Sequence, residues 1–283
     1  MYSMRAQGKF EIWVLPNNLR AASERAAGIL REYDFKVLYL NVQRELNDLV
    51  EELALGAPYE QFINEVRRLG ILRESISSWE YQLKPIFLAL RGLKIRKPSM
   101  RIFCYRSSDS ENSAIKRAEK IALLILRINS IGEVDVREWR KIIYGAISEG
   151  AAFADEEADY IVRAFFREGL KGEKAIIISD FSGRYLLRRL REIGVDVSIR
   201  YIFLPYYFTP LEVLMREAAL MLSRGLDLSD EKIISLAKLH AEFIRDYVLT
   251  SYNYDEAYLR WLKDKVGIVR AALNSTASSS HIF

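Results

Sequence analysis

The stretch Lys174–Gly194, KAIIISDFSGRYLLRRLREIG, decides the fold. Its start predicts a buried strand at Ala175–Ile178, because that run is apolar and rich in β-branched side chains. A polar turn from Ser179 to Gly183 follows, and apolar residues then return at helical spacing up to Gly194, which suits the end of a helix. A further strand is predicted at Val195–Leu204. This order is typical of a parallel α/β sheet, in which ligands bind beyond the carboxyl ends of the strands.

The preceding chain continues the α/β pattern. Three more strands are predicted at Phe10–Leu15, Phe35–Val42 and Met100–Tyr105. The first two flank a predicted helix at Leu19–Tyr33, with Asn18 as its N-cap, and together they form a β–α–β unit. We therefore expect a mainly parallel sheet of about five strands flanked by helices.

The domain organisation follows from where the helical patterns gather. Residues 1–205 are expected to form the α/β domain, with a helical insertion at about residues 106–172. Within the insertion, Val136–Ile147 and Asp155–Leu170 are predicted as separate helices, the second with acidic residues in its first turn. Residues 206–275 are expected to form a helical C-terminal region, followed by a mobile, serine-rich tail at 276–283.

Composition excludes several function classes. The 283 residues are 50% hydrophobic, enough for a sizeable core, and the net charge of +4 is spread over interleaved acidic and basic residues. The single Cys104 argues against a disulfide framework and favours a cytoplasmic location. Since His240 and His281 are the only histidines, we predict no metal and no cofactor, and we interpret His240 as a core residue.

Two further expectations rest on hydrophobicity and charge. No apolar run reaches the roughly 18 residues that span a bilayer, so no membrane partner is expected. Charged residues make up 28% of the chain, which favours a thermophilic source.

Polar residues follow each predicted strand and should converge at one edge of the sheet. The candidate ligand-binding residues are Asn17, Asn18, Asn41, Tyr105, Arg106, Asp180, Ser182 and Arg184. Asp180 is the single candidate for a general base, and its alternative role is to cap its own turn. Ser182 and Gly183 could seat an anion at a helix N-terminus, although no glycine-rich phosphate loop surrounds them.

Basic residues suggest a second kind of partner. Arg184 and Arg188 lie on an arginine-rich helix, and Arg200 and Tyr206 belong to an aromatic–basic segment, so these four are candidate nucleic-acid contacts. The alternative is a solvated helix beside core aromatic residues. Residues 94–99 form a separate basic loop.

Six segments carry a resemblance to a known family. They are EIWVLPNNLRAASERAAGIL (11–30), FKVLYLNVQREL (35–46), SSWEYQLKPIFLALRGLK (77–94), MRIFCYRSS (100–108), EEADYIVRAFF (156–166) and KAIIISDFSGRYLLRRL (174–190). By element order over roughly residues 10–205, the chain resembles the TraB/PrgY, ChaN and erythromycin-esterase-like superfamily. The resemblance implies Gly/His motifs after two strands and acidic residues after two others. Here LPNN (15–18), Asn41, Tyr105 and SDFS (179–182) occupy those positions.

The resemblance therefore implies a catalytically degenerate member. We expect a binding or assembly component that acts with a protein partner or a second copy of itself. One alternative is a nucleic-acid-binding protein of an archaeal defence or processing complex. A second alternative is a hydrolase centred on Asp180, with Arg163 or Arg167 holding an anion.

Overall fold

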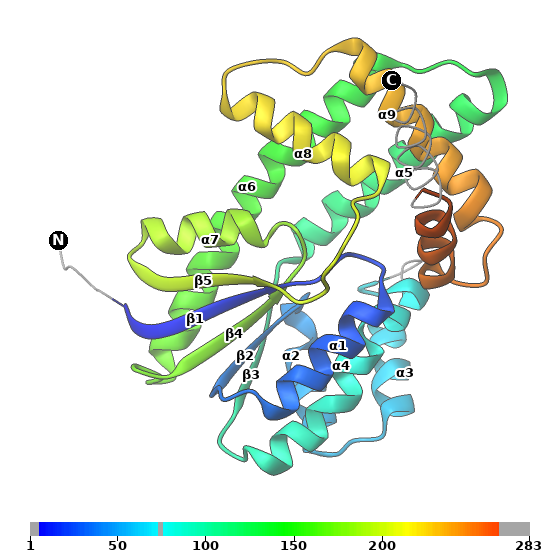
Figure 1. Cartoon of the computed structure of the whole chain (residues 1–283). Coiled ribbons are helices and arrows are strands. Elements are labelled where there is room, and N and C mark those ends of the chain that lie inside the picture. Colours follow the sequence, from blue (N-terminus) through cyan, green and yellow to red (C-terminus); the bar gives the residue numbers. More distant parts are fainter. Residues whose placement is uncertain (1–5, 73–75, 266–283) are drawn as a thin grey trace, which may run out of the picture. The chain divides into compact units, whose positions relative to one another are not determined.

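The sheet is parallel and five-stranded, as predicted. The computed structural model describes residues 6–72 and 76–265 (Figure 1). Its strands are β1 (Ala6–Val14), β2 (Val37–Gln43), β3 (Arg101–Arg106), β4 (Lys174–Ser179) and β5 (Val195–Tyr201). They pair in the order β3-β2-β4-β1-β5, so β4 separates the two strands of the predicted β–α–β unit.

Helices α1, α2 and α4 lie on one face of the sheet and α6 and α7 on the other, and the chain carries further helices outside this sheet (Figure 1). The bounds of the helices follow. They are α1 (Arg20–Glu32), α2 (Asn47–Leu55), α3 (Tyr59–Leu69), α4 (Ile76–Arg96), α5 (Ser108–Ile131), α6 (Val136–Arg167), α7 (Gly183–Glu192), α8 (Pro210–Ser223) and α9 (Asp230–Glu242). A short 3-10 turn, η1 (Arg44–Leu46), follows β2, and a π-helical segment, η3 (Phe243–Val248), follows α9.

Two local predictions were wrong. The helices predicted at Val136–Ile147 and Asp155–Leu170 are one continuous helix, α6, because the alanines of the segment between them favour a helix and offset the single Gly150. Asn18 does not cap α1, whose N-cap is Leu19. Instead Asn18 takes the left-handed conformation, with φ 63°, in the turn after β1.

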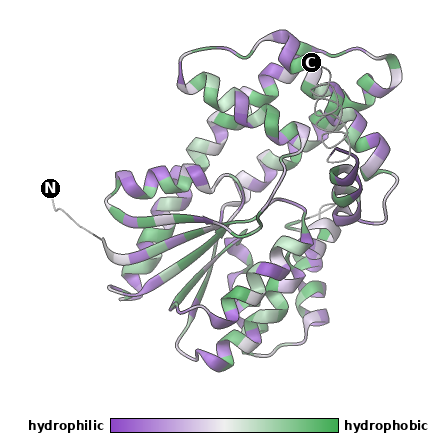
Figure 2. Cartoon of the chain, in the orientation of Figure 1, coloured by the Kyte–Doolittle hydropathy of each residue, from purple (hydrophilic) through white to green (hydrophobic). Residues whose placement is uncertain are grey.

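The core lies on both sides of the sheet. On β1, Phe10, Ile12 and Val14 alternate toward α6 and α7, where they meet buried side chains such as Phe165 and Leu186. Helices α1, α2 and α4 lie on the opposite face (Figure 1). Hydrophobic residues concentrate along the strands as a result (Figure 2). This arrangement leaves the carboxyl ends of the strands as the place where polar side chains gather.

The chain divides into two compact units. The first contains the sheet and spans Met1–Ala118 and Gly145–Pro205. The second is helical and groups Glu119–Tyr144 with Tyr206–Phe283, so α5 and α6 each contribute to both units. Within it, the Leu228 amide donates to Tyr144 Oη at 2.9 Å and Arg140 donates to the Leu228 carbonyl.

Some predictions lie beyond these observations. The predicted tail at 276–283 and residues 266–275 of the predicted helical region fall outside the described residues. Among the helices that are described, none is long and apolar enough to cross a membrane.

Candidate functional site

Three predicted residues from three different strands meet at the carboxyl edge of the sheet. Arg106 ends β3, and its Nη1 donates to Asn41 Oδ1 on β2 at 3.1 Å. The same Nη1 lies 3.8 Å from Asp180 Oδ2, just after β4. Arg106 Nε lies 3.0 Å from Glu111 Oε2 in the first turn of α5. The guanidinium is only 17% exposed, so its charge is balanced by these fixed neighbours rather than by water.

Asp180 caps its own turn. Its Oδ1 accepts a 2.7 Å hydrogen bond from the Ser182 amide, while Oδ2 faces Arg106. Oδ1 therefore makes the bond that the capping interpretation of the sequence requires, while Oδ2 is held only by the longer-range attraction of the Arg106 charge. The Ser182 side chain makes no capping bond to α7.

The other predicted rim residues do not join this cluster. Asn17 and Asn18 are exposed in the turn after β1. Arg184 turns toward β5, where its Nε donates to Tyr201 Oη at 2.7 Å. Tyr105 was predicted at the rim but is fully buried, because its side chain alternates into the core and its hydroxyl donates to the Ile178 carbonyl at 3.0 Å. Burial raises the pKa of Tyr105 well above its usual range.

Glu157 on α6 is a titratable group that the sequence did not reveal. It is buried, and burial raises its pKa to about 7, with the negative charges of Asp180 and Glu156 adding to the effect and Arg106 and Arg44 opposing it. In the sequence, the acidic run at 155–157 reads as the first turn of a helix. Because α6 in fact begins at Val136, these acids lie in the middle of the helix, where the helix dipole does not account for their presence.

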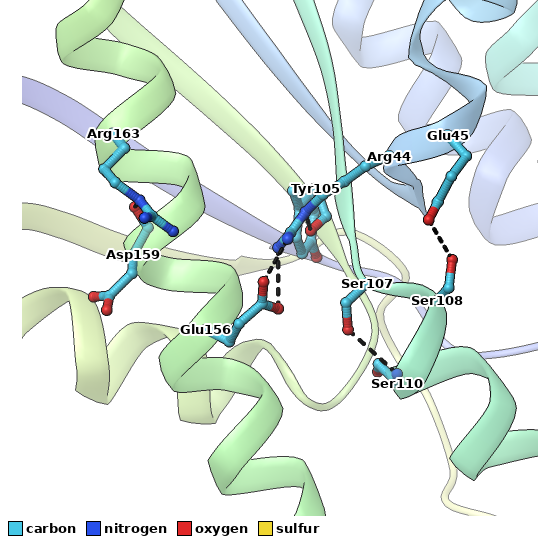
Figure 3. A network of polar contacts seen from close by, with 9 residues as sticks. All are labelled: Arg44, Glu45, Tyr105, Ser107, Ser108, Ser110, Glu156, Asp159 and Arg163. Carbon is cyan, nitrogen blue, oxygen red and sulfur yellow. Dashed lines mark hydrogen bonds and ion pairs between the residues drawn. The ribbon is translucent and has the colours of Figure 1, made fainter.

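A second arginine links α6 to the strand ends (Figure 3). Arg44 pairs with Glu156 through both terminal nitrogens, donates from Nε to the Tyr105 carbonyl at 2.9 Å, and lies 4.0 Å from the Tyr160 ring centroid. Beside it, Ser108 Oγ donates to Glu45 Oε1 at 2.6 Å (Figure 3). The polar side chains in this part of the carboxyl edge are therefore bonded to other groups of the protein.

One of the buried polar atoms near this edge that lack a hydrogen bond from the described residues belongs to Gln43. Gln43, which lies opposite Arg106 in the β2–β3 register, is buried, and its Oε1 accepts no hydrogen bond from the described residues. Such an orphaned acceptor marks the position where a donor, such as water or a ligand hydroxyl, would be stabilised. Within the described ranges, no group of three or more histidine, cysteine, aspartate or glutamate side chains is arranged to hold a metal ion.

The two arginines proposed to act with Asp180 are engaged elsewhere. Arg163 Nε donates to the Asp159 carbonyl on its own helix at 3.2 Å (Figure 3). Arg167 lies 3.8 Å from the neighbouring Glu168. Arg163 thus bonds to the backbone of its own helix and Arg167 pairs with an adjacent acid, and neither contact involves Asp180.

The four predicted nucleic-acid contacts also have internal partners. Arg188 pairs with Glu192 at 2.9 Å, and the Arg200 guanidinium lies over the rings of Trp13 and Tyr33, at 5.7 and 5.8 Å. Tyr206 belongs to the helical unit, where its hydroxyl donates to both oxygens of Glu212.

His240 lies in the core of the helical unit, as its spacing predicts. Burial lowers its pKa to about 4, and its ring stacks on Phe243 at 6.3 Å. Burial also raises the pKa of the Cys104 thiol, which makes it a poor nucleophile. Comparison with models of protein families, with curated proteins and with solved structures gives no match to this chain.

Proposed function

We propose that this protein is a non-enzymatic α/β component that acts by binding or assembly, and that it works in the cytoplasm. The observation that carries the proposal is the double engagement of Asp180 by the Ser182 amide and by Arg106. A general base must reach the proton that it removes, and here both carboxylate oxygens already serve the turn and the ion pair. The cluster has the character of a structural ion network, which holds three strand ends together.

The carboxyl edge of the sheet offers only a few groups that could bind a ligand. The unpartnered Gln43 Oε1 and the buried Glu157 offer one acceptor and one carboxyl group beside the Arg106 network. This set suits a small polar ligand or an ordered water better than a reacting substrate, because it lacks an activated nucleophile. The degenerate motifs of the resembled superfamily agree with this interpretation.

The competing function is a hydrolase, and Glu157 is what favours it. A carboxyl group with a pKa near 7 is suited to general acid–base catalysis at neutral pH. If Glu157 rather than Asp180 were the base, the ion network would orient it and stabilise developing charge.

Turnover assays separate the two functions. The purified full chain, Asp180→Asn and Glu157→Gln would be assayed against ester, peptide and phosphodiester substrates from pH 5 to pH 9. We expect no turnover in any of the three proteins. Hydrolysis that disappears in either variant, while circular dichroism shows an intact fold, would overturn the proposal.

A further inference from the structure

Glu157 occupies a position on α6 that belongs to the hydrophobic core. The buried side chains of this part of α6 recur at helical spacing and pack against the sheet, as Ala154, Ala158, Ile161 and Phe165. Glu157 lies on the same face of the helix and is only 6% exposed. The side of α6 that faces the sheet therefore carries one carboxyl group among apolar neighbours.

The other acids of this part of α6 are exposed and have cationic partners. Glu156 pairs with both terminal nitrogens of Arg44, and Figure 3 shows the two side chains pointing toward each other. Asp155 and Asp159 lie 3.5 and 3.7 Å from Arg189 of α7. Each of these three acids is thus compensated by a cation of a neighbouring element.

Glu157 has no such partner. Within residues 6–72 and 76–265, it forms no hydrogen bond and no ion pair. The ionisable groups that act on it come from several elements, namely Tyr105 and Arg106 of β3, Asp180 after β4, Arg44 of η1 and Glu156 of its own helix. Arg106 is already shared between Asp180 and Glu111. Ionised Glu157 would therefore be a third carboxylate around one guanidinium.

This position favours the protonated form of Glu157. A buried carboxylate without a donor or a counter-ion loses its hydration and gains nothing in return. Burial is accordingly the main cause that raises the pKa of Glu157 to about 7. Proton loss near neutral pH then leaves a charge that the packed helix does not compensate, and only contact with water relieves this cost.

The segment of α6 between Gly150 and Ile161 is the element that can yield. Its packing on the sheet relies on Ala154 and Ala158, whose side chains bury little apolar area, and Gly150 lowers its helix propensity. Beyond it, α6 is fastened more firmly, because Tyr39 Oη donates to the Ile161 carbonyl at 3.0 Å. Strand β4, on the other side of the contact, is hydrogen-bonded to β1 and β2 along both edges.

We propose that the contact between this segment of α6 and the carboxyl edge of the sheet is a pH-sensitive gate, closed while Glu157 is protonated and opened when Glu157 is ionised. Opening would hydrate the Glu157 carboxylate and the Arg106 network beside it. It would also give a ligand access to the unpartnered Gln43 Oε1, which lies opposite Arg106 in the strand register.

The inference rests on the proposed binding function, because it states when the carboxyl edge is open to a ligand. The two can nevertheless fail separately. Turnover that requires Asp180 or Glu157 would overturn the proposed function without bearing on the motion of α6. The gate is measured by amide hydrogen exchange, which needs neither a ligand nor a substrate.

The test is amide hydrogen exchange of the full chain from pH 5 to pH 8, with each rate divided by the intrinsic rate at that pH. If opening returns the pKa of Glu157 from about 7 to its ordinary 4.5, the open form should be about 70-fold more populated at pH 8 than at pH 5. Protection of the amides of residues 154–160 should fall by that factor. Because the opening is local, low urea should change their exchange far less than that of the β4 amides.

Three variants identify the group responsible. Glu157→Gln should keep the protection of residues 154–160 constant over this pH range, and Glu157→Leu should do the same, because neither new side chain ionises. The matched control Glu156→Gln removes the adjacent exposed acid and should retain most of the fall. Circular dichroism of each variant would confirm that it is folded.

Three results would overturn the gate. The first is constant protection of residues 154–160 in the natural chain. The second is a fall that persists when Glu157 is replaced by glutamine or leucine. The third is a fall that occurs only together with that of the β4 amides and with the same dependence on urea, since the segment would then open only by global unfolding.

Discussion

Replacing Arg106 with leucine should destabilise the protein strongly, because the change removes the charge shared by several buried acids. The Arg106 side chain is 17% exposed, and its partners Glu111 and Asp180 are 19% and 17% exposed. Removing one partner of a buried ion pair costs 3–5 kcal/mol, and this residual exposure favours the lower end, about 3 kcal/mol. For a chain of this size, that corresponds to a fall in melting temperature of roughly 6–12 °C.

Thermal and urea unfolding followed by circular dichroism would measure this loss. Arg188→Leu is the matched control, because Arg188 is 81% exposed and its pair with Glu192 is worth at most about 0.5 kcal/mol. The two variants should differ by roughly 2.5 kcal/mol at pH 8. A loss below about 1 kcal/mol for Arg106→Leu, or one equal to that of the control, would refute the assignment of a structural ion network.

The same variant should respond to pH in a defined direction. Arg106 opposes the burial that raises the pKa of Glu157, so without Arg106 this pKa should rise further above that of the unfolded chain. The resulting penalty is present at pH 8, where the unfolded state is ionised, and it is lost as the pH falls and both states become protonated. The stability difference between Arg106→Leu and the natural chain should therefore narrow toward pH 5.

Three further changes test the site and its supports. Burial raises the pKa of Glu157 to about 7 in the folded protein, so the natural chain loses stability as the pH rises from 4.5 to 7. Glu157→Gln should remove this loss and stabilise the protein by about 3 kcal/mol above pH 7. An unchanged pH dependence of the unfolding free energy in urea titrations would contradict this. Asp180→Ala should cost about 1–2 kcal/mol and Asp180→Asn less, because asparagine still accepts from the Ser182 amide; equal melting temperatures would contradict the capping role. Gly183→Ala should cost about 1–3 kcal/mol, since its Cβ would lie 3.0 Å from a β1 side chain. Gly28→Ala in α1 meets nothing within 4 Å and should stabilise the protein by about 0.5–1 kcal/mol. Thermal melts should show a lower melting temperature for Gly183→Ala and a higher one for Gly28→Ala.

The sequence predicted the sheet because its strands are short apolar runs between helices with clear breakers. Breakers of this kind also bound α3 and α8, since Pro58 and Gly70 flank α3 and Pro210 begins α8. The continuity of α6 was missed because Gly150 lies between its two apolar patterns, where the alanines around it nonetheless keep the helix intact.

The candidate site was predictable only in part. Asn41 lies near the end of β2, Arg106 ends β3 and Asp180 directly follows β4, so a parallel sheet places all three at its carboxyl edge. Their contact also depends on β3, β2 and β4 being neighbours, and the sequence did not predict this order. Glu157 was missed because its place depends on how α6 packs against the sheet, which no local pattern encodes. The involvement of Arg44 depends in the same way on a contact across 112 residues.

The order of strands has a consequence for how the chain folds during synthesis. β1 and β2 leave the ribosome early, but β4, which must pair with both, is completed more than a hundred residues later. At roughly 5–20 residues per second, both strands wait on the order of ten seconds with open edges. The nascent chain therefore presents apolar strand edges to other molecules before its own sheet can close, which makes this interval the point where chaperones or aggregation would act.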